Sequence, residues 1–229
     1  MDPFSFAPIA AILDAAYLGI VAIADLLEPL VGGASAALAI AAVTLLVRAV
    51  LIPVGASQVK AEWARRRVAP KLKLLQEKYT KRPELLQQKM MELYRSENVS
   101  PFAGMLPALA QAPIVGIVYA VFIRVNVDGQ VNLLLAAHLF GVPLGATLFT
   151  GGWPVLLVLA LIIGLTAWWG RRTMLRLNPE TPAWLSWLSF LSLVALAFVP
   201  VAAGLYLAIS GIWTQVERAL LRRRYWITA

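Results

Sequence analysis

The stretch VTLLVRAVLIP, residues 43–53, places a single arginine, Arg48, in the middle of an apolar run. A guanidinium keeps its charge at every physiological pH, and an arginine at the centre of a membrane helix costs about 2.5 to 3.5 kcal/mol on insertion scales. The apolar run extends over residues 34–57, which is long enough to cross a hydrocarbon layer of about 30 Å. A polar environment must therefore compensate Arg48 inside this span.

The composition is that of an integral membrane protein. Of the 229 residues, 60% are hydrophobic and only 14% are charged. Cysteine is absent, which excludes disulfides, thiolate metal sites, a cysteine nucleophile and a lipid-modified cysteine. The start MDPFSFAPIA carries no Lys or Arg, so we expect no secretory signal peptide there.

Four further apolar runs follow, over residues 103–123, 153–170, 183–199 and 200–217, and together with the first they predict five membrane helices. The runs 153–170 and 183–199 are short. At 1.5 Å per residue they cover about 23 to 27 Å, which predicts a locally thinned bilayer. No polar loop separates Val199 from Pro200, so a tight turn is expected between the last two helices.

The basic residues indicate how the chain is oriented. In a five-span arrangement, the basic clusters of residues 58–102, 171–182 and 218–229 all fall on one side, whereas the other side holds mainly acids and Arg124. Basic loops stay in the cytoplasm. The N-terminus is therefore expected outside the cytoplasm and the C-terminus inside it.

Residues 1–33 contain an apolar stretch that could be mistaken for a sixth span. Asp14, Asp25 and Glu28 fall within about 60° of one another on a helix at 100° per residue. A sixth span would place these three acids in lipid. We therefore expect an amphipathic helix at the outer membrane surface.

The connection 58–102 has the pattern of two cytoplasmic helices. Leu72, Leu75 and Tyr79 repeat at helical spacing, and Leu86, Met90 and Leu93 do so after the break at residues 81–83. An antiparallel hairpin is predicted, with a kink or restart at Pro70. The basic face of the hairpin is a candidate docking surface for ribosomal RNA, acidic receptor segments or lipid headgroups. The alternative is that it is simply a solvated helix face. The residues of this face are Lys71, Lys73, Lys78, Lys81 and Arg82.

The other spans hold no acidic residue at the depth of Arg48, so a permanent ion pair inside the membrane is not expected. Water in a hydrophilic groove is the favoured compensation, and snorkelling of the side chain toward the cytoplasm is the alternative. The polar residues that could line such a groove are Thr44 at i−4, Gln111 in the second span, and Ser210 and Thr214 in the fifth.

The fold class expected is an all-α integral membrane protein with five transmembrane helices around this groove. The expected order is an N-terminal extracytoplasmic interfacial helix (1–33), TM1 (34–57), a cytoplasmic helical hairpin (58–102), TM2 (103–123), an extracytoplasmic segment (124–152), TM3 (153–170), a cytoplasmic loop (171–182), TM4 (183–199), TM5 (200–217) and a short basic cytoplasmic tail (218–229).

The sequence argues against two other classes of function. A small solute or anion transporter could use Arg48 as its binding charge, but no paired half-sized repeats are visible. An intramembrane enzyme needs paired carboxylates, a serine with a base, or metal ligands, and none is suitably placed. We expect no catalytic residue, no metal, no cofactor and no sequence-specific nucleic acid binding. His138, the single histidine, lies in the outer segment, and the tryptophans cluster at span ends as membrane anchors.

Three stretches resemble the YidC-type membrane protein insertases, the bacterial branch of the Oxa-type family. TLLVRAVLIP resembles the first core span with its groove arginine, MMELYRSENVSPFAGMLPALAQAPIVGIVY the cytoplasmic hairpin leading into the second span, and FVPVAAGLYLAISGIWTQ the last span. The resemblance implies that Arg48 is the groove charge and that Thr44 lies beside it on a substrate-contacting face. It also implies that Gln111 with Pro113 marks the second groove helix and that Tyr206 lies in a substrate-facing aromatic region of the last span. Leu207 stands where the family often has a second aromatic residue.

The resemblance also implies a function. Such a protein lies in the bacterial plasma membrane and inserts transmembrane segments of newly made proteins into the bilayer without ATP hydrolysis. The implied partners are nascent membrane proteins and membrane lipids, with the ribosome, the signal-recognition-particle receptor and the Sec translocon as further candidates.

Overall fold

The computed structural model describes residues 7–100, 102, 105–127, 130–177 and 182–227, and within these ranges the side chains of residues 7, 9, 105–108, 110, 111, 130 and 225–227 are not described. The chain forms two compact units. The first unit comprises residues 1–50 and 114–216, and the second comprises residues 51–113 and 217–229. Helices α5 (Met105–Ile123) and α10 (Val201–Ile227) contribute residues to both units.

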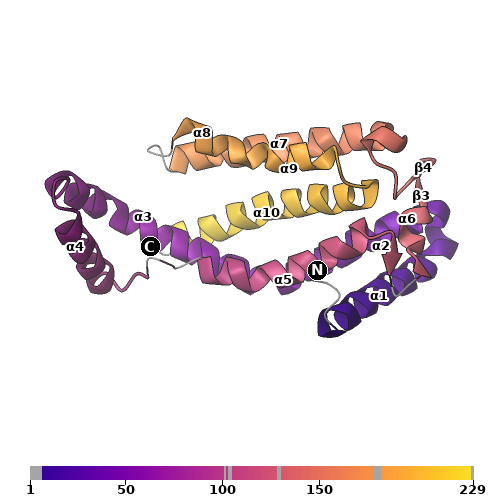
Figure 1. Cartoon of the computed structure of the whole chain (residues 1–229), viewed down its shortest axis with the longest axis horizontal. Coiled ribbons are helices and arrows are strands. Elements are labelled where there is room, and N and C mark those ends of the chain that lie inside the picture. Colours follow the sequence, from indigo (N-terminus) through magenta and orange to yellow (C-terminus); the bar gives the residue numbers. More distant parts are fainter. Residues whose placement is uncertain (1–6, 101, 103–104, 128–129, 178–181, 228–229) are drawn as a thin grey trace. The chain divides into compact units, whose positions relative to one another are not determined.

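The first unit begins with two helices that pack against each other. Helix α1 (Ala7–Val31) leads through the short 3-10 helix η2 (Gly32–Ala34) into α2 (Ser35–Val50), and the chain turns at Gly32, whose φ is 56°. The two helices are in contact and can be followed in Figure 1. Leu13 and Ile20 of α1 and Ile40 of α2 are buried, which leaves Asp25 and Glu28 exposed on α1.

A second group of helices in the same unit packs along one side of the first half of α10. Helix α7 (Trp153–Leu177) packs against the short pieces α8 (Ala183–Ser186), η4 (Trp187–Phe190) and α9 (Leu191–Leu196). The span expected over residues 183–199 is thus three helical pieces. Residues 197–200 form the expected tight connection to α10, which begins directly after Pro200.

Helix α10 approaches α7 and α9 through small residues. A Cβ added at Gly204 would lie 2.8 Å from Leu196 Cδ1 and 3.1 Å from Leu159 Cδ1. At Gly211 it would lie 3.1 Å from Thr166 Oγ1. Close approach of backbones at small residues is how membrane helices gain packing energy, because lipid supplies no hydrophobic force between them.

The connecting segment, residues 124–152, has structure that the helical expectation did not include. It contains two antiparallel strand pairs, β1 (Asn126–Val127) with β2 (Gln130–Val131) and β3 (His138–Leu139) with β4 (Val142–Pro143), along with α6 (Leu133–Ala136) and η3 (Leu148–Thr150). The β3–β4 turn uses Phe140 and Gly141 at φ 53° and 79°. The chain is therefore mostly helical, with a few short strands.

The connecting segment satisfies the free backbone groups at the ends of two helices. Asn132, which is fully buried, donates from Nδ2 to the carbonyls of Val121 (2.8 Å) and Arg124 (2.9 Å) at the end of α5. At the start of α10, the N–H groups of Val201 and Ala202 donate to the carbonyls of Ala146 and Leu144. Helix ends carry unpaired N–H and C=O groups that must find partners when buried.

The second unit is built on α3 (Ile52–Lys78) and α4 (Pro83–Ser96), which are in contact with each other. Helix α3 runs through Pro70 without the expected restart. Glu97, just after α4, pairs with Arg67 at 3.4 Å and accepts a hydrogen bond from Lys71. This hydrogen bond is the main cause that lowers the pKa of the Glu97 carboxyl.

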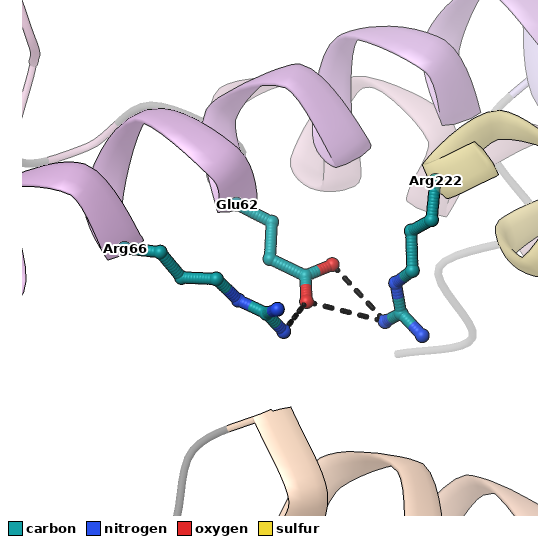
Figure 2. A network of polar contacts seen from close by, with 3 residues as sticks. All are labelled: Glu62, Arg66 and Arg222. Atoms are coloured by element: carbon teal, nitrogen blue, oxygen red, sulfur yellow. Dashed lines mark hydrogen bonds and ion pairs between the residues drawn. The ribbon is translucent and has the colours of Figure 1, made fainter. Parts of the chain in front are cut away.

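A three-residue ion cluster joins α3 to the end of α10 within the second unit (Figure 2). Glu62 accepts hydrogen bonds from Arg222 Nη2 at 3.1 and 3.2 Å and from Arg66 Nη2 at 2.5 Å. Gly55 of α3 lies close to Glu217 of α10, because a Cβ added at Gly55 would collide with the Glu217 carboxylate. These contacts hold residues 217–222 of α10 against α3 at residues 55–66.

Two stretches of the described chain are long and apolar enough to cross a membrane: Ala10–Val50, which comprises most of α1 together with η2 and α2, and Trp153–Leu177, which is α7. Shorter apolar helices lie at Ala112–Ile123 and Ala183–Leu196. Helix α7 continues seven residues beyond the expected end at residue 170, to Leu177. The added residues include Arg171, Arg172 and Arg176, so they do not lengthen the apolar part of the helix, and the expected thinning of the bilayer stays a prediction. The five-span arrangement stays a prediction.

We predict that Asn132→Ala destabilises the first unit by about 1 to 3 kcal/mol, because it leaves the carbonyls of Val121 and Arg124 and the N–H of Leu134 without their side-chain partner. Thermal unfolding in mild detergent measures the effect. Asn126→Ala, at an exposed position of β1, is the matched control and should change stability by less than about 0.5 kcal/mol. Equal shifts in the two variants would contradict the capping role.

Candidate functional site

Arg48 lies in the last turn of α2 and is partly exposed. Its Nε donates a hydrogen bond to Ser210 Oγ of α10 at 3.3 Å. This distance is at the long end of the range for N–H···O hydrogen bonds, and a guanidinium has further N–H donors that this one contact does not use. The sequence therefore brings Arg48 and Ser210, residues 162 positions apart, into one site.

Tyr206 lies one turn before Ser210 on α10 and is 4% exposed. Its side chain interacts with those of Ser210 and Arg48. Its ring packs between two aromatic residues of α5, with centroid distances of 6.2 Å to Tyr119 and 5.8 Å to Phe122. Helix α5 thus forms the aromatic wall of the site, and the Tyr206 hydroxyl extends the polar cluster.

Thr44 and Thr214 use their hydroxyls within their own helices. Thr44 Oγ1 donates to the Ile40 carbonyl at 2.6 Å, and Thr214 Oγ1 donates to the Ser210 carbonyl at 2.8 Å. Thr44 has no exposed surface, whereas Thr214 is partly exposed. Thr44 can therefore meet a substrate only if the helices around it move.

Helix α10 has a polar face and a separate face of small residues that packs on other helices. Tyr206, Ser210 and Thr214 fall within about 80° of the helix surface at 100° per residue, and Gly204 and Gly211, which pack on α7 and α9, centre about 110° away. The packed face fixes the rotation of the helix. The polar face is thereby held toward Arg48.

Arg48 has no acidic partner in this arrangement. Among the residues that the structure describes, no Asp or Glu lies within ion-pair distance of its guanidinium, and no group of three or more His, Asp or Glu could hold a metal ion. Among the described side chains, the hydroxyls of Ser210 and Tyr206 contact the guanidinium. An anionic or hydrogen-bond-accepting group from outside the protein would find unused donors there.

The remaining predicted residues are less completely described. Gln111 lies in α5, but its side chain is outside the described residues. The five basic residues proposed for docking are all exposed: Lys71, Lys73, Lys78, Lys81 and Arg82. Lys71 is engaged by Glu97, and Lys78 lies 5.5 Å from the centre of the Tyr79 ring.

Sequence reasoning missed Tyr119 and Phe122, whose rings contact Tyr206. The sequence does place both rings on one face of the helix, because Tyr119 and Phe122 are three positions apart in an apolar helix. Without the packing of α5 against α10, nothing in the sequence distinguishes these rings from ordinary core residues.

Comparison with known families identifies the chain. The family model described as 60Kd inner membrane protein matches residues 26–227, which includes every residue of this site. The chain belongs to this family. Membership supports an inner membrane protein, in keeping with the apolar helices.

Individual relatives support the same family assignment. The chain is 41% identical over 90 residues to the membrane protein insertase YidC of Clostridium perfringens and 42% identical over 91 residues to that of Oceanobacillus iheyensis. These alignments cover 39% and 38% of this chain and only 38% and 36% of the relatives. A longer alignment, 28% identical over 196 residues, covers 83% of this chain and 69% of YidC 1 of Halalkalibacterium halodurans. The resemblance to YidC-type proteins seen in the sequence is confirmed.

We predict that position 48 is in contact with water in the membrane-embedded protein, because a guanidinium without an acidic partner retains its hydration. The chain has no native cysteine, so Arg48→Cys and Thr214→Cys, both at partly exposed positions, provide unique thiols. A membrane-impermeant maleimide should modify them at least about tenfold faster than Leu46→Cys, since only a hydrated thiol ionises to the reactive thiolate.

Leu46 is the matched control because it lies on α2 about 200° from Arg48 and is 60% exposed on an apolar surface. Equal rates at positions 46 and 48, with slow modification at position 214, would contradict a hydrated site.

Proposed function

We propose that this chain inserts transmembrane segments of newly made proteins from the cytoplasm into the lipid bilayer. The observation that carries the proposal is Arg48, a partly exposed arginine in an apolar helix that is held by Ser210 and paired with no acid of the described chain. Family membership and the insertase names of the relatives support the same function. The aligned part of the first two relatives is short, so their whole activity is proposed here rather than carried over.

The proposed arrangement has five membrane helices around a hydrophilic groove. The N-terminal helix lies at the outer surface, and α3 and α4 form the cytoplasmic hairpin. The distribution of basic residues supports this orientation, since the positive-inside rule places residues 58–102 and the tail in the cytoplasm. In this arrangement, the groove opens toward the cytoplasm and toward lipid.

The mechanism is electrostatic and needs no ATP or cofactor. The short hydrophilic region that precedes or follows a substrate helix enters the groove, attracted by Arg48. Hydroxyl groups and water lower the desolvation cost of that polar region, which is several kcal/mol per unpaired group in hydrocarbon. The apolar substrate segment then passes sideways into lipid. Because Tyr206 and Ser210 are buried, this passage requires α5 to separate from α10 near Tyr119.

Partners follow from the same proposal. Nascent membrane proteins are the substrates, and lipids receive them. The exposed basic residues of the hairpin are the proposed contact for the ribosome or the signal-recognition-particle receptor, and the Sec translocon is a further proposed partner. Lys81 and Arg82 are better placed for this than Lys71, whose charge Glu97 already engages.

Photo-crosslinking to a stalled nascent membrane protein tests the function. p-Azidophenylalanine at position 206 resembles tyrosine in shape, and a second probe at the partly exposed position 214 samples the same face of α10. We expect crosslinks to the nascent chain from both positions. The control is position 161 on α7, where Leu161 is 65% exposed and would face lipid. A small solute transporter would give no nascent-chain crosslink above this control at 206 or 214.

The role of the charge is tested separately in reconstituted vesicles. Arg48→Ala should reduce insertion of a substrate with an acidic translocated tail by about tenfold, which corresponds to about 1.4 kcal/mol of lost attraction. Arg48→Lys should lose less, because the charge is kept although the fork geometry is lost. Full insertion of the acidic-tailed substrate by Arg48→Ala would exclude the electrostatic mechanism while leaving the crosslinking result intact.

A further inference from the structure

The end of α7 carries a second group of arginines that the proposed insertion mechanism does not use. Arg171, Arg172 and Arg176 lie within two turns, and the two latter residues are exposed at i and i+4 on one face. Like charges at this spacing repel. None of the three forms an ion pair with a carboxylate among the residues that the structure describes.

Two of these guanidiniums are stacked on indole rings. Arg172 Cζ lies 4.0 Å from the centre of the Trp168 ring, and Arg171 Cζ lies 4.7 Å from that of Trp187. Arg171 is held further by a 3.0 Å hydrogen bond from Nε to Oγ of Ser186, which is fully buried. Stacking occupies the flat face of a guanidinium and leaves its edge donors free for a planar or tetrahedral anion.

The depth of the group follows from the length of α7. Trp153 at its start is 58% exposed, and an exposed indole favours the headgroup level. From there, Trp168 lies about 22 Å along the helix and Arg172 about 28 Å at 1.5 Å per residue. With a hydrocarbon thickness of about 30 Å, the stacked pair sits at the opposite headgroup boundary.

We infer that Arg171, Arg172 and Arg176, with Trp168 and Trp187, form a binding surface for the headgroup phosphate of an anionic phospholipid. The guanidinium edges supply the phosphate donors, and the exposed rings of Trp168 (45%) and Trp187 (58%) lie against the glycerol and upper acyl chain. Charge complementarity selects an anionic lipid over a zwitterionic one. The inference requires only that α7 spans the membrane and is independent of the insertion function.

Native mass spectrometry of the full chain in detergent tests this, with phosphatidylglycerol and phosphatidylcholine as the probes. The wild-type chain should prefer phosphatidylglycerol by about tenfold, a modest value for several basic side chains at an anionic surface. Arg171→Gln/Arg172→Gln/Arg176→Gln should reduce this preference to below about twofold. Arg172→Gln/Arg176→Gln leaves the Arg171–Ser186 bond intact and should lose most of the preference even if the triple variant folds poorly.

The matched control removes three exposed charges of the second unit: Lys60→Gln/Arg65→Gln/Arg223→Gln. It should keep the preference. The inference is overturned if the control loses as much preference as the α7 double variant, because net charge alone would then explain binding. It is also overturned if the wild-type chain shows no preference, or if inorganic phosphate competes as well as the lipid does, which would indicate a free-anion site.

Discussion

The rest of the molecule depends on how one charged side chain is accommodated in an apolar helix. Arg48 meets Ser210 because α10 has two faces with separate tasks. Gly204 and Gly211 let α10 approach α7 and α9 so closely that a methyl group at either position would be crowded, and this contact fixes its rotation. A rotation of α10 by one residue, about 100°, would replace Ser210 with an apolar neighbour and leave the guanidinium without a protein partner. The packing of α10 on α7 and α9 therefore determines that Ser210 faces Arg48.

The connecting segment explains why this arrangement is held from one end. This segment follows α5, and its Asn132 donates hydrogen bonds to the free carbonyls at the end of that helix. The carbonyls of Leu144 and Ala146 accept hydrogen bonds from the N–H groups at the start of α10. Helices α5 and α10 carry the aromatic wall and the polar face of the site. Their ends at residues 121–124 and 201–202 are thus held by one short stretch of chain, whereas their other ends belong to the second unit. Separation of α5 from α10 to admit a substrate would be easiest away from residues 121–124 and 201–202.

Much of this could be predicted from the sequence, because apolar runs, basic clusters and the isolated Arg48 are signals that depend on composition and spacing alone. The membrane class, the family and the choice of Ser210 came from such signals. Such signals do not show which residues are in contact in the folded chain. The burial of Thr44 depends on the packing around α2, the rings of Tyr119 and Phe122 depend on α5 meeting α10, and the strands of residues 126–143 depend on turns such as the one at Phe140 and Gly141. The end of α7 was also shifted, because the helix continues past the apolar run that ends at residue 170 and reaches Leu177.

The positive charges of the chain also divide by how they are balanced. In the second unit, Glu62 bridges Arg66 and Arg222, and Glu97 engages Lys71, so these cations hold helices together. In the first unit, Arg48 is held by a hydroxyl and Arg171 by a hydroxyl and a ring, without an acid among the described residues. A cation balanced by an internal acid has little attraction left for an outside anion, whereas one balanced only by dipoles keeps most of it. The same chain can therefore use arginine as a structural tie near the tail and as an open binding charge in and beside the membrane.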